Sequence, residues 1–100
     1  MTQKTRDVLI AARAIIADPA MWYQGDWSAS GKIYDADEPC CAKTAIFRAG
    51  PIALACDAIR CAARATPDCV SLNLFNDEPT TTHADIMAVF DRAIAGEQAA

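Results

Sequence analysis

The sequence predicts an all-α domain of four helices, with an aromatic loop or short hairpin between the first and second helices. Apolar residues recur at helical spacing in four segments, and each segment is bounded by a capping residue, a proline or a glycine. Only residues 70–75 alternate as a strand would, and no second strong strand is available to pair with them. A length of 100 residues fits one domain, 1–100, with one core.

The first helix is predicted at about residues 4–17. Thr2 is positioned to cap it, and Asp18-Pro19 ends it because the residue before a proline avoids the helical region. The apolar positions of this segment share one broad face: Val8, Leu9, Ala12, Ile15 and Ile16.

Residues 19–38 have no helical period and contain most of the aromatic residues of the chain. Ser30-Gly31 lies between two short segments that would pair as a hairpin, and an ordered irregular loop is the alternative. An isolated hairpin is marginally stable in water, so we expect the tryptophans of this connection to pack on the helices. A connection of this length in a small domain is either structural or functional.

The second helix is predicted from about residue 38 to residue 49, with Pro39 in its first turn and Asp35 or Asp37 as the cap. Cys40 and Cys41 would then lie in the first turn. The third helix, 52–65, is apolar on nearly all sides and is predicted to be central and buried on several sides.

Residues 70–75 are consistent with either an extended segment or one helical turn. The last helix has a capping-box pattern, with Thr82 followed by Asp85 three residues later. Gly96 is its predicted stop.

Composition excludes several classes of function. The net charge of −4 argues against binding to a nucleic-acid backbone, and no apolar run is long enough to span a membrane. The N-terminal segment is interrupted by charges and does not resemble a signal peptide, so we expect a cytoplasmic protein. Five cysteines without metal-ligand spacing, one histidine and the absence of cofactor motifs predict neither a metal nor a cofactor.

Three residues have the types found in cysteine hydrolases, namely Cys41, His83 and Asn76. A thiol near a helix N-terminus is easier to ionise, and Cys40 is an alternative nucleophile with His83. However, His83 lies in the first turn of its own helix, where the dipole disfavours an imidazolium. The predicted protein is therefore non-enzymatic, with the hydrolase as the alternative.

Short motifs occur in a fixed order along the chain. They are L-x-x-A-x-x-x-I at 9–16, W-x-Q-G at 22–25, C-A-x-x-A-I at 41–46, N-D-x-P at 76–79 and T-x-x-D-I-M-x-x-F-D-R-A at 82–93. This order resembles a small bacterial and phage family that is defined only as a domain of unknown function. The family often has glycine in place of Thr44 and tryptophan in place of Phe75. The resemblance covers nearly the whole chain and implies no reaction.

The motif residues allow a structural and a functional interpretation. In the structural one, Trp22 plugs the end of the bundle, Gly25 adopts a positive φ angle, and Asn76 and Asp77 bond to their own backbone in a turn. In the functional one, the aromatic connection contacts another protein, because tryptophan and tyrosine are enriched in interfaces. The candidate binding residues are Trp22, Tyr23, Gln24, Trp27, Asn76 and Asp77. A homo-oligomer is a third possibility.

Overall fold

The computed structural model describes residues 1–25, 28, 30 and 38–96. In this part of the chain there are five α-helices and two short 3₁₀ helices. They follow in the order α1 (Gln3–Ile15), η1 (Pro19–Met21), α2 (Ala42–Ala49), α3 (Ile52–Ala65), η2 (Pro67–Cys69), α4 (Leu72–Asp77) and α5 (His83–Ala95). The all-α prediction is confirmed. The predicted number of four helices is wrong, because residues 72–77 also form a helix.

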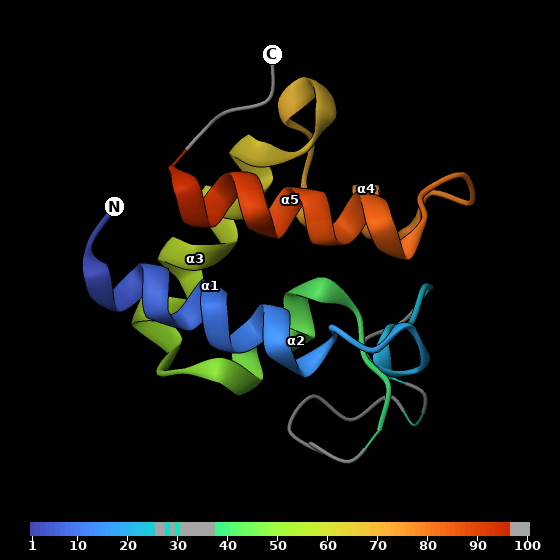
Figure 1. Cartoon of the computed structure of the whole chain (residues 1–100), viewed down its shortest axis with the longest axis horizontal. Coiled ribbons are helices and arrows are strands. Elements are labelled where there is room, and N and C mark those ends of the chain that lie inside the picture. The colour runs from blue at the N-terminus through green and yellow to red at the C-terminus, as the bar shows by residue number, and fades with distance from the viewer. Residues whose placement is uncertain (26–27, 29, 31–37, 97–100) are drawn as a thin grey trace.

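The helices pack around α3, which contacts each of the other four α-helices. In Figure 1, α1 and α5 run side by side in opposite directions, and α3 crosses behind them. Two arginines of α1 make polar contacts with α5. Arg13 forms an ion pair with Asp91 at 2.8 Å, and Arg6 Nε donates to the carbonyl of Ile94 at 2.9 Å.

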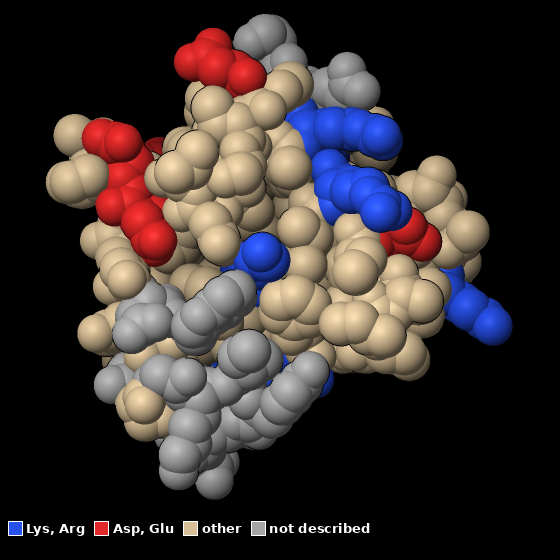
Figure 2. Space-filling view, turned by 180° about the vertical axis from the view of Figure 1, so that it is seen from behind, with Lys and Arg blue, Asp and Glu red and all other residues tan. Residues whose placement is uncertain are grey.

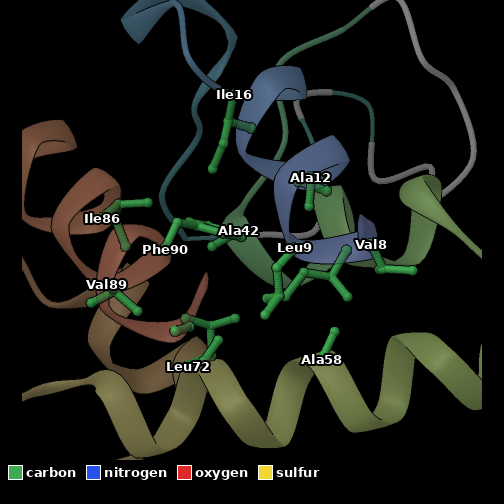
Figure 3. Close-up of a cluster of buried hydrophobic side chains, with 14 of the residues drawn as sticks. Val8, Leu9, Ala12, Ile16, Ala42, Ala58, Leu72, Ile86, Val89 and Phe90 are labelled. Carbon is green, nitrogen blue, oxygen red and sulfur yellow. The ribbon is translucent and has the colours of Figure 1, made fainter. Parts of the chain in front are cut away.

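The core is formed where α1, α2, α4 and α5 meet the inner face of α3 (Figure 3). Its largest fully buried apolar side chains are Phe90, Leu9, Ile16, Ile46, Leu72, Ile86 and Val89. Several of them follow the spacing that predicted the first and last helices. Burial of this apolar face is the main source of stability for helices as short as these.

α3 has the predicted bounds, but only one of its faces is fully buried. That face consists of alanines, namely Ala55, Ala58, Ala62 and Ala65. Leu54, Ile59 and Cys61 on the flanks of this face are half-buried against the core, whereas Ile52 is 62% exposed at the start of the helix. Small side chains let the neighbouring helices approach α3 closely, so the helix is central without being enclosed.

A close contact also fixes the turn between α2 and α3. A Cβ atom on Gly50 would lie 2.7 Å from Cγ2 of Val8, which is closer than real Cβ contacts allow. Because glycine has no side chain, α1 can pack directly on this turn at Gly50.

Helix boundaries agree with the sequence where local chemistry sets them. Thr2 caps α1, and Thr82 and Asp85 make both bonds of the capping box of α5. The second helix differs, because it begins at Ala42 with Cys41 as its cap. Pro39 is therefore outside the helix, and the predicted start near residue 38 is wrong. Asp35 and Asp37, the predicted caps, lie outside the described residues.

The charged surface is mixed. Figure 2 shows the molecule from behind, with acidic side chains toward the upper left and top and several basic side chains toward the upper right. Among the described residues, no helix is long and apolar enough to cross a membrane.

Candidate functional site

Asn76 lies at the centre of a buried hydrogen-bond network at one end of the helix bundle. Its Oδ1 accepts from the indole Nε1 of Trp22 at 2.7 Å and from the backbone N–H of Ala42 at 3.0 Å. Its Nδ2 donates to the carbonyl of Tyr23 at 3.1 Å and to Oδ1 of Asp77 at 2.9 Å. A primary amide offers two donors and two acceptor sites, so every polar position of this fully buried side chain is used.

Gln24 extends the network to the turn between α4 and α5. Its Nε2 lies 3.0 Å from the carbonyl of Asn76, 3.0 Å from that of Glu78 and 3.2 Å from that of Thr81. Carbonyls at the end of a helix lack intrahelical partners. The side chain of Gln24 therefore provides a hydrogen-bond donor to carbonyls at the end of α4 and in the following turn.

Gly25 follows Gln24 and has a positive φ angle, which glycine adopts more readily than other residues. Its φ angle is +98°, as the sequence predicted, and its N–H donates to Oδ1 of Asp77 at 2.9 Å. A residue with a Cβ is strained at this φ value. We define the Asn76 clasp as the residues Trp22, Tyr23, Gln24, Gly25, Asn76 and Asp77.

A short backbone pairing brings the clasp to the start of α2. The N–H of Cys40 donates to the carbonyl of Met21 at 3.0 Å, and the N–H of Tyr23 donates to the carbonyl of Cys40 at 2.9 Å. Both backbone groups of Cys40 are thus used outside a helix. This pairing explains why α2 starts two residues after Cys40, and it places Ala42 against Asn76.

The interpretation of Asn76 and Asp77 as turn residues that bond to their own backbone is wrong. They are the last two residues of α4, and their main partners are Trp22, Ala42 and Gly25. Trp22 does pack on the core. The structural role expected for it therefore agrees with its position, whereas its link to Asn76 was not predicted.

The cysteines next to the clasp are buried. Sγ of Cys41 accepts from the N–H of Thr44 at 3.4 Å and lies 3.3 Å from the hydroxyl of Thr44, so this thiol caps α2. Burial raises the pKa of the Cys40 thiol to about 11, which keeps it protonated at neutral pH. Cys40 is fully buried and Cys41 is 4% exposed, so neither sulfur is accessible to a substrate in this structure.

His83 borders the clasp from the start of α5. Its Nε2 lies 2.7 Å from the carbonyl of Ile16, and its ring centre lies 5.9 Å from that of Trp22 with the planes tilted by 57°. Bonding to a backbone carbonyl requires the proton on Nε2, so this nitrogen cannot act as a base while the contact lasts.

The other end of the aromatic connection is held by Glu38. Its carboxylate accepts from the hydroxyls of Ser28 and Ser30 and from the N–H of Ser30, while Arg48 donates to its carbonyl at 3.0 Å. Hydrogen bonding from Ser30 is the main cause that lowers the pKa of this carboxyl group, and Ser28 and Arg48 contribute. Two carboxylates therefore fix the aromatic connection. Asp77 accepts from the N–H of Gly25, and Glu38, which precedes α2, accepts from Ser28 and Ser30.

Five of the six predicted binding residues come together in the clasp, and Trp27 lies outside the described residues. Sequence reasoning missed Ala42 and Thr81, which contribute only backbone groups to the network. A backbone contribution leaves no residue-type signal in a sequence. It also missed Gly25 as a partner of Asp77, although the glycine of the W-x-Q-G motif was a detectable signal.

The clasp leaves one aromatic side chain without an internal polar contact. Tyr23 is half-buried, and its hydroxyl makes no hydrogen bond with any other described residue. By contrast, the indole N–H of Trp22 is bonded to Asn76. Within the described ranges, no three His, Cys, Asp or Glu side chains are grouped so that they could hold a metal ion.

Comparison with known proteins identifies the family. No curated protein and no solved structure matches this chain. A family model described as a family of unknown function (DUF6197) matches residues 1–96 and so includes every residue of the clasp. The chain therefore belongs to the DUF6197 family.

Proposed function

We propose that this chain is a small, non-enzymatic protein-interaction domain that contacts its partner protein through Tyr23 and the exposed edge of the clasp. The observation that carries the proposal is that the side chain of Tyr23 differs from the other side chains of the clasp in its hydrogen bonding. The side chains of Trp22, Gln24, Asn76 and Asp77 bond inside the fold, whereas the Tyr23 hydroxyl has no partner among the described residues.

The clasp would prepare Tyr23 for binding. Both backbone polar groups of Tyr23 are fixed, the N–H by Cys40 and the carbonyl by Asn76. A tyrosine held in this way offers a large amphipathic contact area and loses little conformational freedom on association. Tyrosine is also among the residues that most often dominate interface energies.

The contacts of the thiols favour this proposal over a cysteine hydrolase. The sulfur of Cys41 caps α2, the thiol of Cys40 is held protonated, and Nε2 of His83 is engaged with Ile16. Asn76 is enclosed by its own four hydrogen bonds. Each residue of the alternative constellation thus already has a role in the fold.

The proposed setting is the cytoplasm of a bacterium or a phage-infected cell, where the domain would be an accessory factor. Five thiols that form no disulfide support a reducing compartment. The net charge of −4 supports a protein partner over a nucleic acid. No cofactor is proposed.

Affinity capture from native lysate tests the proposal, with bound proteins quantified by mass spectrometry. Tyr23→Ala is expected to lower the recovery of a specific partner about tenfold while leaving the melting temperature nearly unchanged. Ile52→Ala is the control, because it removes a large apolar side chain that is 62% exposed and lies outside the clasp, at the start of α3. This control should retain the partner.

Recovery that is identical for the wild type, Tyr23→Ala and Ile52→Ala would contradict the proposed contact. Light scattering of the purified protein addresses the homo-oligomer. A dimer mass that falls to the monomer mass in Tyr23→Ala would identify the partner as a second copy of this chain.

A further inference from the structure

The two segments that form the clasp carry negative charge and no positive charge. Residues 14–25 and 65–91 contain no lysine or arginine, and the structure describes both segments completely. The second segment contributes the exposed carboxylates of Asp77, Glu78 and Asp85. Figure 2 shows a group of acidic side chains toward the upper left, apart from the basic side chains toward the upper right. The charges of the molecule are therefore unevenly distributed over its surface.

Within the described residues, no ion pair neutralises these three carboxylates. Asp77 and Asp85 accept only from backbone N–H groups and from the amide of Asn76, and all of these donors are neutral. The side chain of Glu78 makes no hydrogen bond or ion pair with any described residue, since only its carbonyl is bonded. The negative charge at this surface is thus open to a positively charged partner.

A groove of about 310 Å³ lies beside these carboxylates, between η2, the turn after α4 and α5. Glu78 and Asp85 line it, and Phe75 and Ala88 are among its apolar residues. The groove adjoins the clasp, because the side chain of Gln24 donates to the carbonyl of Glu78 at 3.0 Å. We call this surface the Glu78 groove.

One cationic side chain of the described residues, Arg92, also lines the Glu78 groove. Its Nε and Nη2 both donate to the carbonyl of Ala65, at 3.0 and 2.8 Å. It forms no ion pair with Glu78 or Asp85 in the described structure. The lining therefore combines two carboxylates with one guanidinium that is directed at a backbone carbonyl, and negative charge is in excess.

From this combination we infer that the partner protein presents a basic segment to the Glu78 groove. A lysine or arginine side chain of that segment lays its aliphatic stem against Phe75 and Ala88, and its cationic end meets the carboxylates of Glu78 and Asp85. An aromatic ring such as that of Phe75 also attracts a cation. The inference rests on the proposed function for the partner's contact at Tyr23, and it adds the chemistry of that partner.

The test is an NMR titration of the ¹⁵N-labelled protein with two synthetic capped peptides. One peptide contains three Lys-Lys-Ser-Leu repeats, and the other contains glutamate in place of every lysine. Up to about 1 mM of the lysine peptide, corresponding to weak binding, is expected to shift the amide signals of Asp77, Glu78 and Ala88. The glutamate peptide should leave these signals unchanged.

Two matched charge reversals separate the groove from general electrostatics. Glu78→Lys is expected to weaken binding of the lysine peptide about tenfold through like-charge repulsion. Because the Glu78 side chain makes no polar contact in the described fold, this variant should keep nearly the wild-type melting temperature. Asp7→Lys makes the same change in net charge at an exposed position of α1, outside the groove, and it should leave peptide binding nearly unchanged.

No shift with the lysine peptide, shifts located away from the groove, or equal losses of binding in Glu78→Lys and Asp7→Lys would overturn the inference. The capture experiment tells this failure apart from a failure of the proposed function. A partner that is lost with Tyr23→Ala but fully retained with Glu78→Lys would overturn the inference and support the contact at Tyr23. A partner that is retained with Tyr23→Ala but lost with Glu78→Lys would contradict the contact at Tyr23 and support the basic ligand of the groove.

Discussion

Among single residues, Asn76 joins segments that are more than thirty residues apart. It connects the end of α4 to Trp22 and Tyr23 on the aromatic connection and to Ala42 at the start of α2. The α2 contact is notable because the first N–H groups of a helix have no intrahelical acceptor. One side chain therefore satisfies a helix start and anchors a long connection.

Replacement of Asn76 by alanine is expected to lower the free energy of unfolding by about 2–4 kcal/mol. The substitution removes a fully buried amide and leaves the Trp22 indole and the Ala42 N–H without their acceptor. Urea denaturation measures the loss. Asn73→Ala is the control in the same helix and should change the stability by less than about 0.5 kcal/mol. Similar losses for the two variants would contradict the role given to the clasp.

The cysteines are expected to differ in reactivity according to burial. Cys69 is exposed, whereas Cys40 is buried and its pKa is raised to about 11 from 9.0. At neutral pH this leaves about one hundredth of the ordinary thiolate fraction at Cys40, because each pH unit is a factor of ten. Timed alkylation followed by peptide mass spectrometry should label Cys69 first and Cys40 last.

Labelling in urea provides the reference state for this experiment, since all five thiols should then react at similar rates. Rapid native labelling of Cys41, at or above the rate of Cys69, would favour the hydrolase alternative. That result would show that the thiol of Cys41 is accessible to reagents, contrary to its burial.

At the scale of elements, α3 is the helix against which the others pack. Its inner face is alanine throughout, and the helices on that face contribute the larger side chains, including Leu9 and Phe90. An arginine supports the end of α3, because Nε and Nη2 of Arg92 both donate to the carbonyl of Ala65, at 3.0 and 2.8 Å. Such contacts compensate for carbonyls that have no partner in the last turn.

Adding side-chain volume to this inner face should be costly. Ala58→Val is expected to lower the free energy of unfolding by about 1–3 kcal/mol, because the fully buried site has no room for two more methyl groups. Ala53→Val is the control on the exposed face of the same helix and should cost only the difference in helix propensity, about 0.5 kcal/mol. Calorimetric melting curves of the two variants measure the difference.

Equal destabilisation by Ala58→Val and Ala53→Val would mean that the helix propensity of valine, and not packing, decides the outcome. The close approach of the neighbouring helices to α3 would then have no energetic consequence.

The anchor of the aromatic connection at Glu38 should make stability depend on pH. Hydrogen bonding lowers the pKa of Glu38 in the folded state, so its contribution is fully present above the ordinary value of 4.5. This contribution is lost as pH falls through the lower folded pKa. Urea midpoints measured from pH 6 down to pH 3 should therefore fall less steeply for Glu38→Gln than for the wild type. Identical slopes would exclude Glu38 as a source of the acid sensitivity.

At the scale of the whole molecule, the clasp connects a segment from the first third of the chain to one from the last third by hydrogen bonds. Residues 22–25 contact residues 76–81, and the same segment pairs with Cys40 next to α2. Contacts between distant parts of a chain are costly in loop entropy, so they require strong and specific partners. The W-x-Q-G and N-D motifs provide those partners.

Much of the helical structure could be predicted because its signals are local. The bounds of α3, the Thr2 cap, the capping box at Thr82 and the stop at Gly96 all follow from residues within one or two turns. A local signal for α4 was also present, since Ser71 caps it through the N–H of Leu74. Alternation at residues 70–74 made a helical turn and an extended segment equally consistent with the sequence.

The sequence by itself determined the all-α class, most helix ends and the apolar faces of the first and last helices, because these depend on periodicity and on capping within a few residues. Only the tertiary structure decided where α2 begins, which face of α3 is buried and what Asn76 binds. Those features depend on hydrogen bonds and packing between segments tens of residues apart. The partners include the backbone of Cys40 and Ala42, whose contributions no residue-type pattern records.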